Sequence, residues 1–297
     1  MSVDPAPRRA VAPVPAARRA RHGRGAPPWV LMYHSVTEVP RATGTTGTAR
    51  ATRATRATRA TRATEDPYRI TVSPGRLDRQ LRWLREHGLR GVGVGELLRA
   101  RAAGRDAGLV GLTFDDGYAD FLTGALPLLR RHDCTATVFV LPGKPGGDNA
   151  WDPLGPRKPL LSEAGIRAVA DAGMEVGSHG LLHRDLTTAD DAALEQESAA
   201  SRRLLAELTG RAPDGFCYPY GAVDVRAVAA VRAAGYGYAC ALDPGPLTGR
   251  HALPRVHIDA ADTCWRLHLK RALHPLRRRA LPLEETTTPA ATPGGIR

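Results

Sequence analysis

Two aspartates and two histidines stand where side chains of their kinds can share a metal ion. Asp115 and Asp116 end the apolar run LVGLTF, where a turning chain allows one carboxylate to bind a metal while the other takes a proton. His179 and His183 follow the short apolar run EVG. Their i, i+4 spacing places both imidazoles on one side of a helical turn. One Asp and two His form a three-ligand set that leaves a position open for water, as catalytic zinc sites require.

Each half of this set also has a plain structural explanation. An Asp-Asp-Gly sequence is typical of the turn that opens a loop, and histidines four residues apart are common on protein surfaces. The metal interpretation gains weight because both pairs follow predicted strands. The carboxyl ends of such strands meet at one rim of a barrel, where sites are built.

Three further segments carry candidate residues. The run FCYPYG forms a proline-shaped turn after another predicted strand, so Tyr218, Pro219 and Tyr220 are candidates to contact a substrate. The backbone N–H of Tyr220 is a candidate donor to an oxyanion. His34, after VLMY, and His257, in PRVHI, are candidates for a general acid. Taken alone, a run such as FCYPYG is more often an ordinary strand end, and each histidine is more often a packed or surface residue.

The elements that position these residues alternate along the chain. TVSPGRLDRQLRWLREHGL predicts a helix capped by Ser73, begun at Pro74 and ended near Gly88. Further helices are predicted over 125–131, 162–172, 188–209 and 222–234, strands at 109–114, 136–141, 174–179, 215–220, 236–242 and 253–258, and a short strand and turn over 91–100. Short apolar strands alternating with helices indicate β/α units with parallel strands. Six or more units over roughly 230 residues favour an α/β barrel over an open sheet.

The two ends of the chain and one internal segment lack this pattern. Residues 1–27 are rich in Arg, Pro and Ala and are predicted to be a disordered tail. Residues 41–64 repeat Thr, Ala and Arg without a large apolar side chain, which predicts a low-complexity insert in a loop. Residues 266–297 are basic and then rich in Thr and Pro, and are predicted to be a second disordered tail. One domain is therefore expected over 28–265.

The charge of the chain is unevenly distributed. The whole chain has 42 Lys and Arg against 30 Asp and Glu, whereas residues 65–265 hold 23 basic and 26 acidic residues. The basic excess therefore lies in the ends and the insert, and its bias towards Arg is typical of a GC-rich genome. No specific nucleic-acid partner is expected. The sequence has no run of 18 apolar residues, so no transmembrane segment is expected either.

The cysteines and the N-terminal sequence favour a cytoplasmic protein. Cys134, Cys217, Cys240 and Cys264 form no C-x-x-C pair and are predicted to be free thiols. The Arg-rich N-terminus is not followed by the apolar core of a signal peptide.

Three segments together resemble the motifs of a known family, the polysaccharide deacetylases with the NodB-homology domain, or carbohydrate esterase family 4. TFDDGYAD is similar to the first motif, EVGSHGLLHRDL to the second and FCYPYG to the third, in the family's order. The resemblance runs from about Pro28 to Thr263, apart from the insert. It implies an α/β fold, a distorted (β/α) barrel of the NodB-homology type, and a divalent metal, zinc first.

The resemblance also implies roles for the residues. Asp115 is the general base, and Asp116, His179 and His183 are the metal ligands. The implied enzyme is a hydrolase of a carbon–nitrogen bond other than a peptide bond, and it removes the acetyl group of an N-acetylated amino sugar in a polysaccharide, oligosaccharide or glycan intermediate. Its partner is an N-acetylated carbohydrate. An O-acetyl carbohydrate esterase and a non-catalytic carbohydrate-binding relative are the alternatives.

Two departures from the family pattern lead to further expectations. The third motif of the family commonly carries an Arg that orients the catalytic Asp, whereas this chain has Cys217 there. We expect Arg255, in LPRV, to supply the guanidinium from a neighbouring strand. No clear L-x-H motif follows near the C-terminus, but LMYHSV resembles the branch with poly-N-acetylglucosamine deacetylases, in which that motif stands at the front of the domain. We therefore predict His34 as the general acid and His257 as the second candidate.

Overall fold

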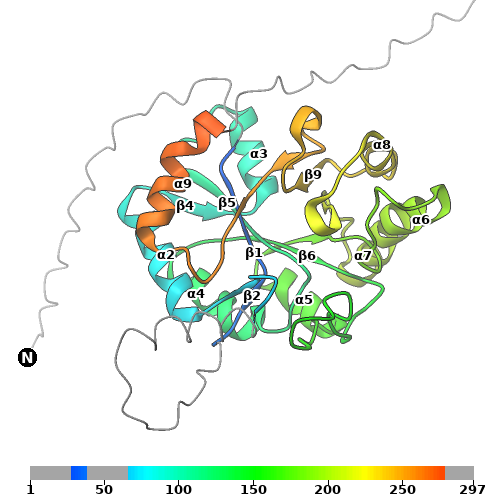
Figure 1. The fold of residues 1–297 in the computed structure, drawn as a ribbon, viewed down its shortest axis with the longest axis horizontal. Helices are drawn as coiled ribbons and strands as arrows, with labels where there is room; N and C mark the ends of the chain where they lie inside the picture. Colours follow the sequence, from blue (N-terminus) through cyan, green and yellow to red (C-terminus); the bar gives the residue numbers. More distant parts are fainter. Residues whose placement is uncertain (1–27, 39–65, 278–297) are drawn as a thin grey trace, which may run out of the picture.

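The computed structural model describes residues 28–38 and 66–277. The predicted N-terminal tail, the insert at 41–64 and the segment 278–297 lie outside the described residues. Short strands lie at the centre of the molecule and helices surround them (Figure 1). The predicted alternation of strands and helices is confirmed.

Within the described residues, nine strands form one sheet in which every pairing is parallel. The strands are β1 (Val30–Tyr33), β4 (Arg90–Val92), β5 (Leu109–Phe114), β6 (Thr137–Val140), β7 (Glu175–Ser178), β8 (Gly215–Cys217), β9 (Tyr238–Ala241), β10 (Leu253–Pro254) and β11 (Val256–His257). Their order is β10-β9-β8-β7-β6-β5-β1-β11, with β4 also paired to β5. Parallel strands covered on both faces need nearly continuous apolar sequence, as in LVGLTF.

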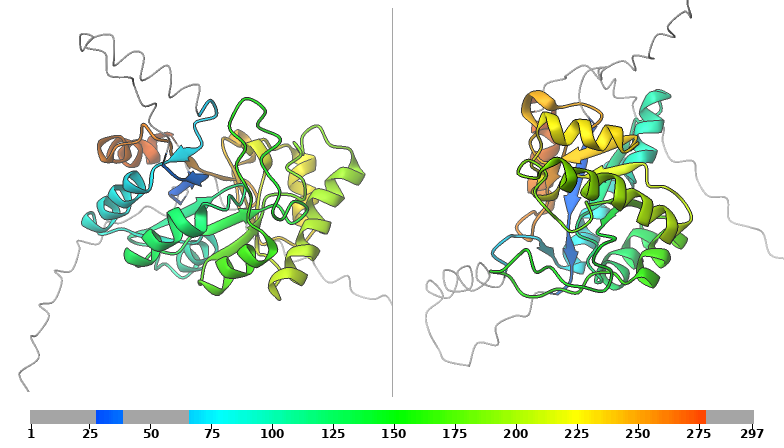
Figure 2. Two further views of the ribbon diagram at one scale, coloured as in Figure 1. Left: turned by 90° about the horizontal axis from the view of Figure 1, so that it is seen from below. Right: turned by 90° about the vertical axis from the view of Figure 1, so that its right-hand side faces the viewer.

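The two ends of this sheet meet in a single run of chain. β10 pairs with β9 at one end, β11 pairs with β1 at the other, and Arg255 alone separates β10 from β11. The sheet is therefore nearly closed into a barrel, as predicted. Figure 2 shows the helices outside the strands from two further directions. A small second sheet pairs β2 (Ser35–Val36) with β3 (Thr71–Val72).

The helices begin where side chains satisfy their first backbone N–H groups. Ser73 caps α2 (Pro74–Glu86), Ser162 caps α5 (Glu163–Asp171), Asp190 caps α6 (Asp191–Glu195) and Asp224 caps α8 (Val225–Ala233). The other helical segments are α3 (Val94–Ala102), η1 (Phe121–Ala125), α4 (Leu126–Arg131), η2 (Gln196–Ala200), α7 (Ser201–Thr209), η3 (Pro219–Gly221), η4 (Gly245–Leu247) and α9 (Cys264–Arg277). In the described parts of the chain, no helix has the length and apolar character needed to cross a membrane.

Of the short strand and turn predicted over 91–100, the strand is confirmed as β4 and the turn is wrong. The predicted turn is helix α3, which follows β4 directly. Three glycines in GVGVG suggest a turn, but side chains from other strands hold the start of this helix. Thr137 Oγ1 accepts a hydrogen bond from the N–H of Val94 at 2.8 Å, and Glu175 Oε2 accepts one from Gly95 at 2.9 Å. These contacts are distant in sequence, so the local pattern does not show them.

The predicted boundary at residue 265 is also wrong. The chain continues as α9, which packs against α2 and buries Leu267 completely. The segment was predicted to be disordered because it is basic, but it forms a helix with one apolar side. The first part of the predicted tail therefore belongs to the domain.

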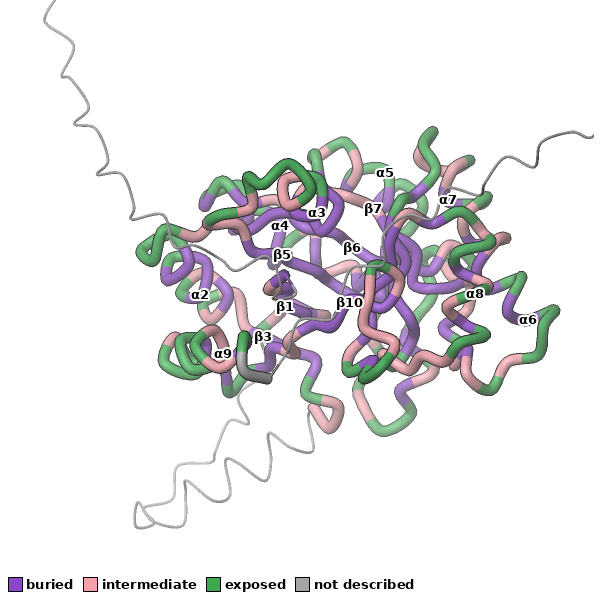
Figure 3. Tube along the Cα trace, turned by 90° about the horizontal axis from the view of Figure 1, so that it is seen from above, coloured by how far each residue is buried: buried purple, intermediate pink, exposed green. Residues whose placement is uncertain are grey.

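The core lies between the strands and the inner sides of the helices, while the outer turns of the helices are exposed (Figure 3). Its largest cluster joins residues of β1, β5 and β6 to residues of α2, α4, α5 and α9. The four cysteines are free thiols, as predicted, and three of them are buried.

Candidate active site

The carboxyl ends of β5 and β7 bring the predicted metal ligands together. Asp115 and Asp116 follow β5, and His179 directly follows β7. His183 lies four residues further on, and all four side chains are buried. Because parallel strands end on the same side of a barrel, residues far apart in sequence converge at this rim.

The two adjacent aspartates separate because the chain turns sharply between them. The N–H of Asp115 still donates to the carbonyl of Tyr33 at 2.9 Å, which extends the pairing of β5 with β1. Asp116 then takes a φ of +69° and Gly117 a φ of +65°. Left-handed conformations of this kind cluster at functional sites, and here they direct the two carboxylates to different partners.

Both carboxylate oxygens of Asp115 are held by Arg255. Nη1 of Arg255 donates to Oδ1 at 2.7 Å, and Nη2 donates to Oδ2 at 2.8 Å. Both side chains are buried. Burial raises the pKa of Asp115, but the charges of Arg255 and His179 and the hydrogen bonds from Arg255 together outweigh burial and bring that pKa below its usual value. Asp115 is therefore an ionised carboxylate of fixed orientation, and its cation comes from the run that closes the barrel.

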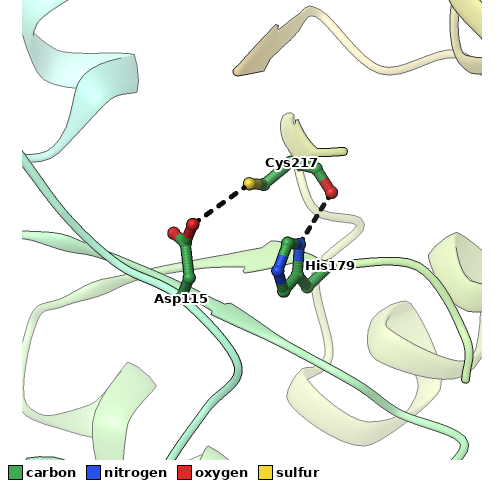
Figure 4. A group of neighbouring side chains, drawn as sticks. All are labelled: Asp115, His179 and Cys217. Atoms are coloured by element: carbon green, nitrogen blue, oxygen red, sulfur yellow. Dashed lines mark hydrogen bonds between the residues drawn. The ribbon is translucent and has the colours of Figure 1, made fainter. Parts of the chain in front are cut away.

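Cys217 completes this contact from β8. Its thiol donates to Asp115 Oδ2 at 3.5 Å (Figure 4), and Nη2 of Arg255 donates to its sulfur at 3.0 Å. The guanidinium that the family commonly carries at the position of Cys217 thus reaches the aspartate from residue 255.

Asp116, His179 and His183 point at one another. Oδ1 of Asp116 lies 3.2 Å from Nε2 of His179 and 3.3 Å from Nε2 of His183. Among the described residues, this buried oxygen has no hydrogen-bond partner. An orphaned carboxylate oxygen that faces two imidazole nitrogens is an arrangement that a cation completes. The donor set therefore fits a divalent metal.

A second group of possible ligands consists of Asp115, His179 and Cys217 (Figure 4), and it shares His179 with the first group. Nδ1 of His179 lies 2.8 Å from the backbone oxygen of Cys217 and must donate its proton there. Nε2, which faces Asp116, is thus the nitrogen whose lone pair is available to a metal. Burial raises the pKa of the Cys217 thiol, and Arg255 occupies Asp115. The first group is the better metal site.

His183 reaches the site from irregular chain. The segment 179–189 is described throughout and contains no helix, and both Gly180 (φ +83°) and His183 (φ +66°) are left-handed. The predicted helical turn is therefore wrong, although the spacing identified a pair that does converge. Trp151 stacks on the His183 ring with centroids 4.4 Å apart, and Tyr220 meets the same ring edge-on at 4.6 Å.

Of the three residues in the turn after β8 that were predicted to contact a substrate, only Tyr220 is exposed at the site. Tyr220 is 54% exposed and lies at the rim, whereas Pro219 is buried. The ring of Tyr218 is buried in the core, and its hydroxyl donates to the carbonyl of His251 at 2.8 Å. Successive residues of extended chain point to opposite sides. Since Cys217 faces Asp115, the Tyr218 side chain points away from the site.

His34 and His257 lie side by side, with ring centroids 5.9 Å apart. Nδ1 of His34 is buried and has no hydrogen-bond partner among the described residues. Burial, aided by the charge of His34, lowers the pKa of His257 to about 4. His257 is therefore neutral near neutral pH, so His34 is the better candidate for a proton donor.

Comparison with known proteins shows which family this chain resembles. The family model for polysaccharide deacetylase matches residues 102–239, which include both aspartates and both histidines of the site. A putative polysaccharide deacetylase of Bacillus subtilis, YxkH, is 25% identical over 194 residues, which cover 64% of this chain and 66% of that protein. Over the matched region this chain is similar to the polysaccharide deacetylases.

Two further proteins are similar to this chain. The poly-beta-1,6-N-acetyl-D-glucosamine N-deacetylase of Staphylococcus aureus is 22% identical over 201 residues, which cover 63% of this chain and 68% of the relative. The deacetylase PplD of Streptococcus pyogenes, solved in complex with acetate, superposes with a TM-score of 0.63 at 21% identity. That superposition covers 82% of this chain and 98% of PplD, and it confirms the barrel.

Two residues of this protein contact the site but were not predicted from the sequence. Trp151 comes from the loop between β6 and α5, which carries no signal of its own. Glu197 lies in η2, and its carboxylate accepts hydrogen bonds from the chain between the two histidines. A signal for Glu197 does exist, because polar residues share a helical stripe with buried leucines: Leu194, Glu197, Ser198, Ser201 and Leu205.

Proposed function

We propose that this protein is a metal-dependent deacetylase that hydrolyses the acetamide of an N-acetylated amino sugar in a glycan. The observation that carries the proposal is the position of an ionised, fixed Asp115 beside the triad of Asp116, His179 and His183. The printed names of the relatives support the substrate class, since one deacetylates poly-N-acetylglucosamine and another binds acetate.

The triad would hold the metal through one carboxylate oxygen and two Nε2 atoms. This donor set suits zinc first among divalent ions, and such an ion supplies an acidified water and polarises an acetyl carbonyl. Contacts within the protein orient the two histidine side chains of the triad. The backbone oxygen of Cys217 fixes the tautomer of His179, and the rings of Trp151 and Tyr220 fix the plane of His183.

The remaining residues move protons. Asp115 accepts the proton of the attacking water, and Arg255 keeps the carboxylate ionised and correctly turned. The backbone N–H of Tyr220 donates to the oxyanion that forms on the acetyl carbonyl. His34 gives a proton to the departing nitrogen. One amide and one water thus become acetate and a free amino sugar.

Acetate release from purified protein tests the proposal. The substrates are β-1,6-linked and β-1,4-linked N-acetylglucosamine oligomers, assayed as purified, after dialysis against a chelator, and after zinc is returned. We expect release that falls on chelation and recovers with zinc. The His183→Ala variant should lose both bound metal and turnover. Full metal content and full turnover in that variant would refute the site.

The ester alternative is separated in the same assay. Acetylated xylan oligomers present O-acetyl groups in place of acetamides, so release from xylan alone would assign an O-acetyl carbohydrate esterase. Absence of metal and of release on every substrate would assign a non-catalytic relative. The cytoplasmic location expected from the N-terminal sequence stays a prediction.

A further inference from the structure

We infer that Glu197 is a positioning residue that prearranges the chain between the two histidine ligands for metal binding. The inference rests on the proposed function, because it concerns the same triad. Glu197 lies in η2, is 1% exposed, and belongs to none of the ligand groups. Burying a carboxylate costs free energy, so it is tolerated only when hydrogen-bond donors satisfy its oxygens.

The partners of this carboxylate are backbone groups of the ligand-bearing segment. Oε2 of Glu197 accepts from the N–H of Leu181 at 2.7 Å and from that of Leu182 at 3.0 Å. Oε1 accepts from Leu182 as well, at 3.3 Å. Both amides lie between His179 and His183. Hydrogen bonds to an ionised acceptor are about twice as strong as neutral ones, so the carboxylate takes the place of the secondary structure that this segment lacks.

The carboxylate also packs directly on the strained part of the segment. A Cβ atom on Gly180 would approach Glu197 Oε2 to within 2.5 Å, and the φ of Gly180 is +83°. His183 follows with its own left-handed φ of +66°. A histidine in this conformation persists only where its surroundings determine it. Glu197 supplies these surroundings for the residues just before His183.

A second contact from the same helical turn holds the start of the segment. Ser178, the last residue of β7, donates to Ser201 Oγ at 3.0 Å and accepts from the N–H of Gly180 at 3.2 Å. Ser201 in turn donates to the carbonyl of Glu197 at 2.6 Å. π-Helical turns such as η2 are frequent at functional sites. This one presents Glu197, and Ser201 at the start of α7 contacts the same stretch of chain.

The geometry excludes a surface ion pair as the reason for this glutamate. Nε of Arg184 lies 3.8 Å from Oε1, and the Arg184 side chain is 55% exposed. A pair of that kind contributes little. The loop amides are the closer partners, and glutamine cannot replace the carboxylate fully, because its NH2 group would face a backbone N–H.

The test compares Glu197→Gln with Glu195→Gln, which removes an exposed carboxylate two residues earlier. Zinc affinity is measured by competition with a chromophoric chelator, and the visible absorption of cobalt-loaded protein reports the ligand geometry. We expect Glu197→Gln to bind zinc about 10-fold to 100-fold more weakly, with an altered cobalt spectrum. Glu195→Gln should match the wild type. Wild-type affinity and an unchanged spectrum in Glu197→Gln would overturn the inference, even if that variant melts earlier.

Hydrogen exchange in the metal-free wild type gives a test that needs no variant. We expect the amides of Leu181 and Leu182 to exchange slowly before any metal is added. Exchange at the rate of free peptide, slowed only by zinc, would mean that the metal and not Glu197 orders the segment. A wild type that binds neither zinc nor cobalt would refute the proposed function, whereas equal binding by wild type and Glu197→Gln would refute this inference alone.

Discussion

Two adjacent aspartates receive different roles from their surroundings. Asp115 faces a guanidinium and Asp116 faces two imidazoles, which is the division that the proposed roles of base and metal ligand require. The chemistry of each carboxylate follows from its neighbours. The left-handed turn at Asp116 is what allows this division within two residues.

The first prediction concerns the base. In Asp115→Asn, turnover should fall by about 10²-fold to 10⁴-fold, because the neutral amide cannot take a proton from water. The zinc content should stay at the wild-type level, because the three ligands remain. Acetate release and metal analysis of the same preparation check both statements. Asp148→Asn, which changes an exposed carboxylate of the loop between β6 and α5, serves as the control. Equal losses in both variants would contradict the assignment.

The second prediction concerns His257. Its folded pKa of about 4 lies below the unfolded value of about 6.5. Between these values the unfolded chain binds a proton that the folded protein does not, so stability falls as the pH falls through this window. The loss attributable to His257 is at most about 3 kcal/mol. Urea unfolding at pH 7, 6, 5 and 4 should show a smaller loss in His257→Gln than in the wild type. Parallel losses would show that His257 titrates normally.

At the scale of residues, the sequence revealed what lies in short motifs. Asp115, Asp116 and the two histidines stand next to strand ends, which a local pattern can show. Arg255 could be expected only because Cys217 leaves the aspartate without its usual cation. A helical stripe signals that Glu197 is buried, but its role depends on packing between η2 and a loop, which the stripe does not show.

At the scale of elements, α9 shows how a helix can be concealed by its composition. Its sequence is basic, yet Leu267 is fully buried against the core around α2, while Leu269 is 40% exposed. The helix therefore stabilises the domain through one side only.

The third prediction tests this packing. Leu267→Ala should lower the free energy of unfolding by about 2–5 kcal/mol, because it leaves a cavity in the core. Leu269→Ala should change it by less than about 0.5 kcal/mol, as is usual at exposed positions. Urea unfolding of both variants provides the measurement. Equal effects would mean that α9 does not belong to the folded domain.

Helices whose N-cap residue is adjacent in sequence were predictable. The helix whose first N–H groups bind side chains from distant strands was not. Ser73 and Ser162 stand directly before α2 and α5, so their hydrogen bonds can be anticipated. The start of α3 depends on Thr137 and Glu175, which arrive from β6 and β7. The barrel itself was predictable because its alternation repeats along the whole domain.

At the scale of the whole molecule, the metal should act as part of the fold. The triad joins the ends of two strands, so a bound ion links segments that are distant in sequence. An ion that binds only the folded state stabilises it by mass action, by about 2.7 kcal/mol when its free concentration is 100 times its Kd.

The fourth prediction follows from this linkage. At that zinc concentration the melting temperature should rise by about 5–10 °C, and a chelator should reverse the rise. His179→Ala should show no rise, because it lacks one ligand. Differential scanning calorimetry with and without zinc checks the shift. An equal rise in His179→Ala would place the ion elsewhere on the protein.

The closure of the sheet sets the order in which a nascent chain can complete itself. Leu31 of β1 pairs with Leu112 on one side and with Val256 on the other, so the first strand leaves the ribosome long before its last neighbour. Until then β1 presents an open edge, which is prone to wrong pairing. The same late segment brings Arg255 to Asp115. A ribosome paused before this segment would carry a nearly complete chain with an unsealed barrel and an uncompensated aspartate, and there the need for a chaperone would be greatest.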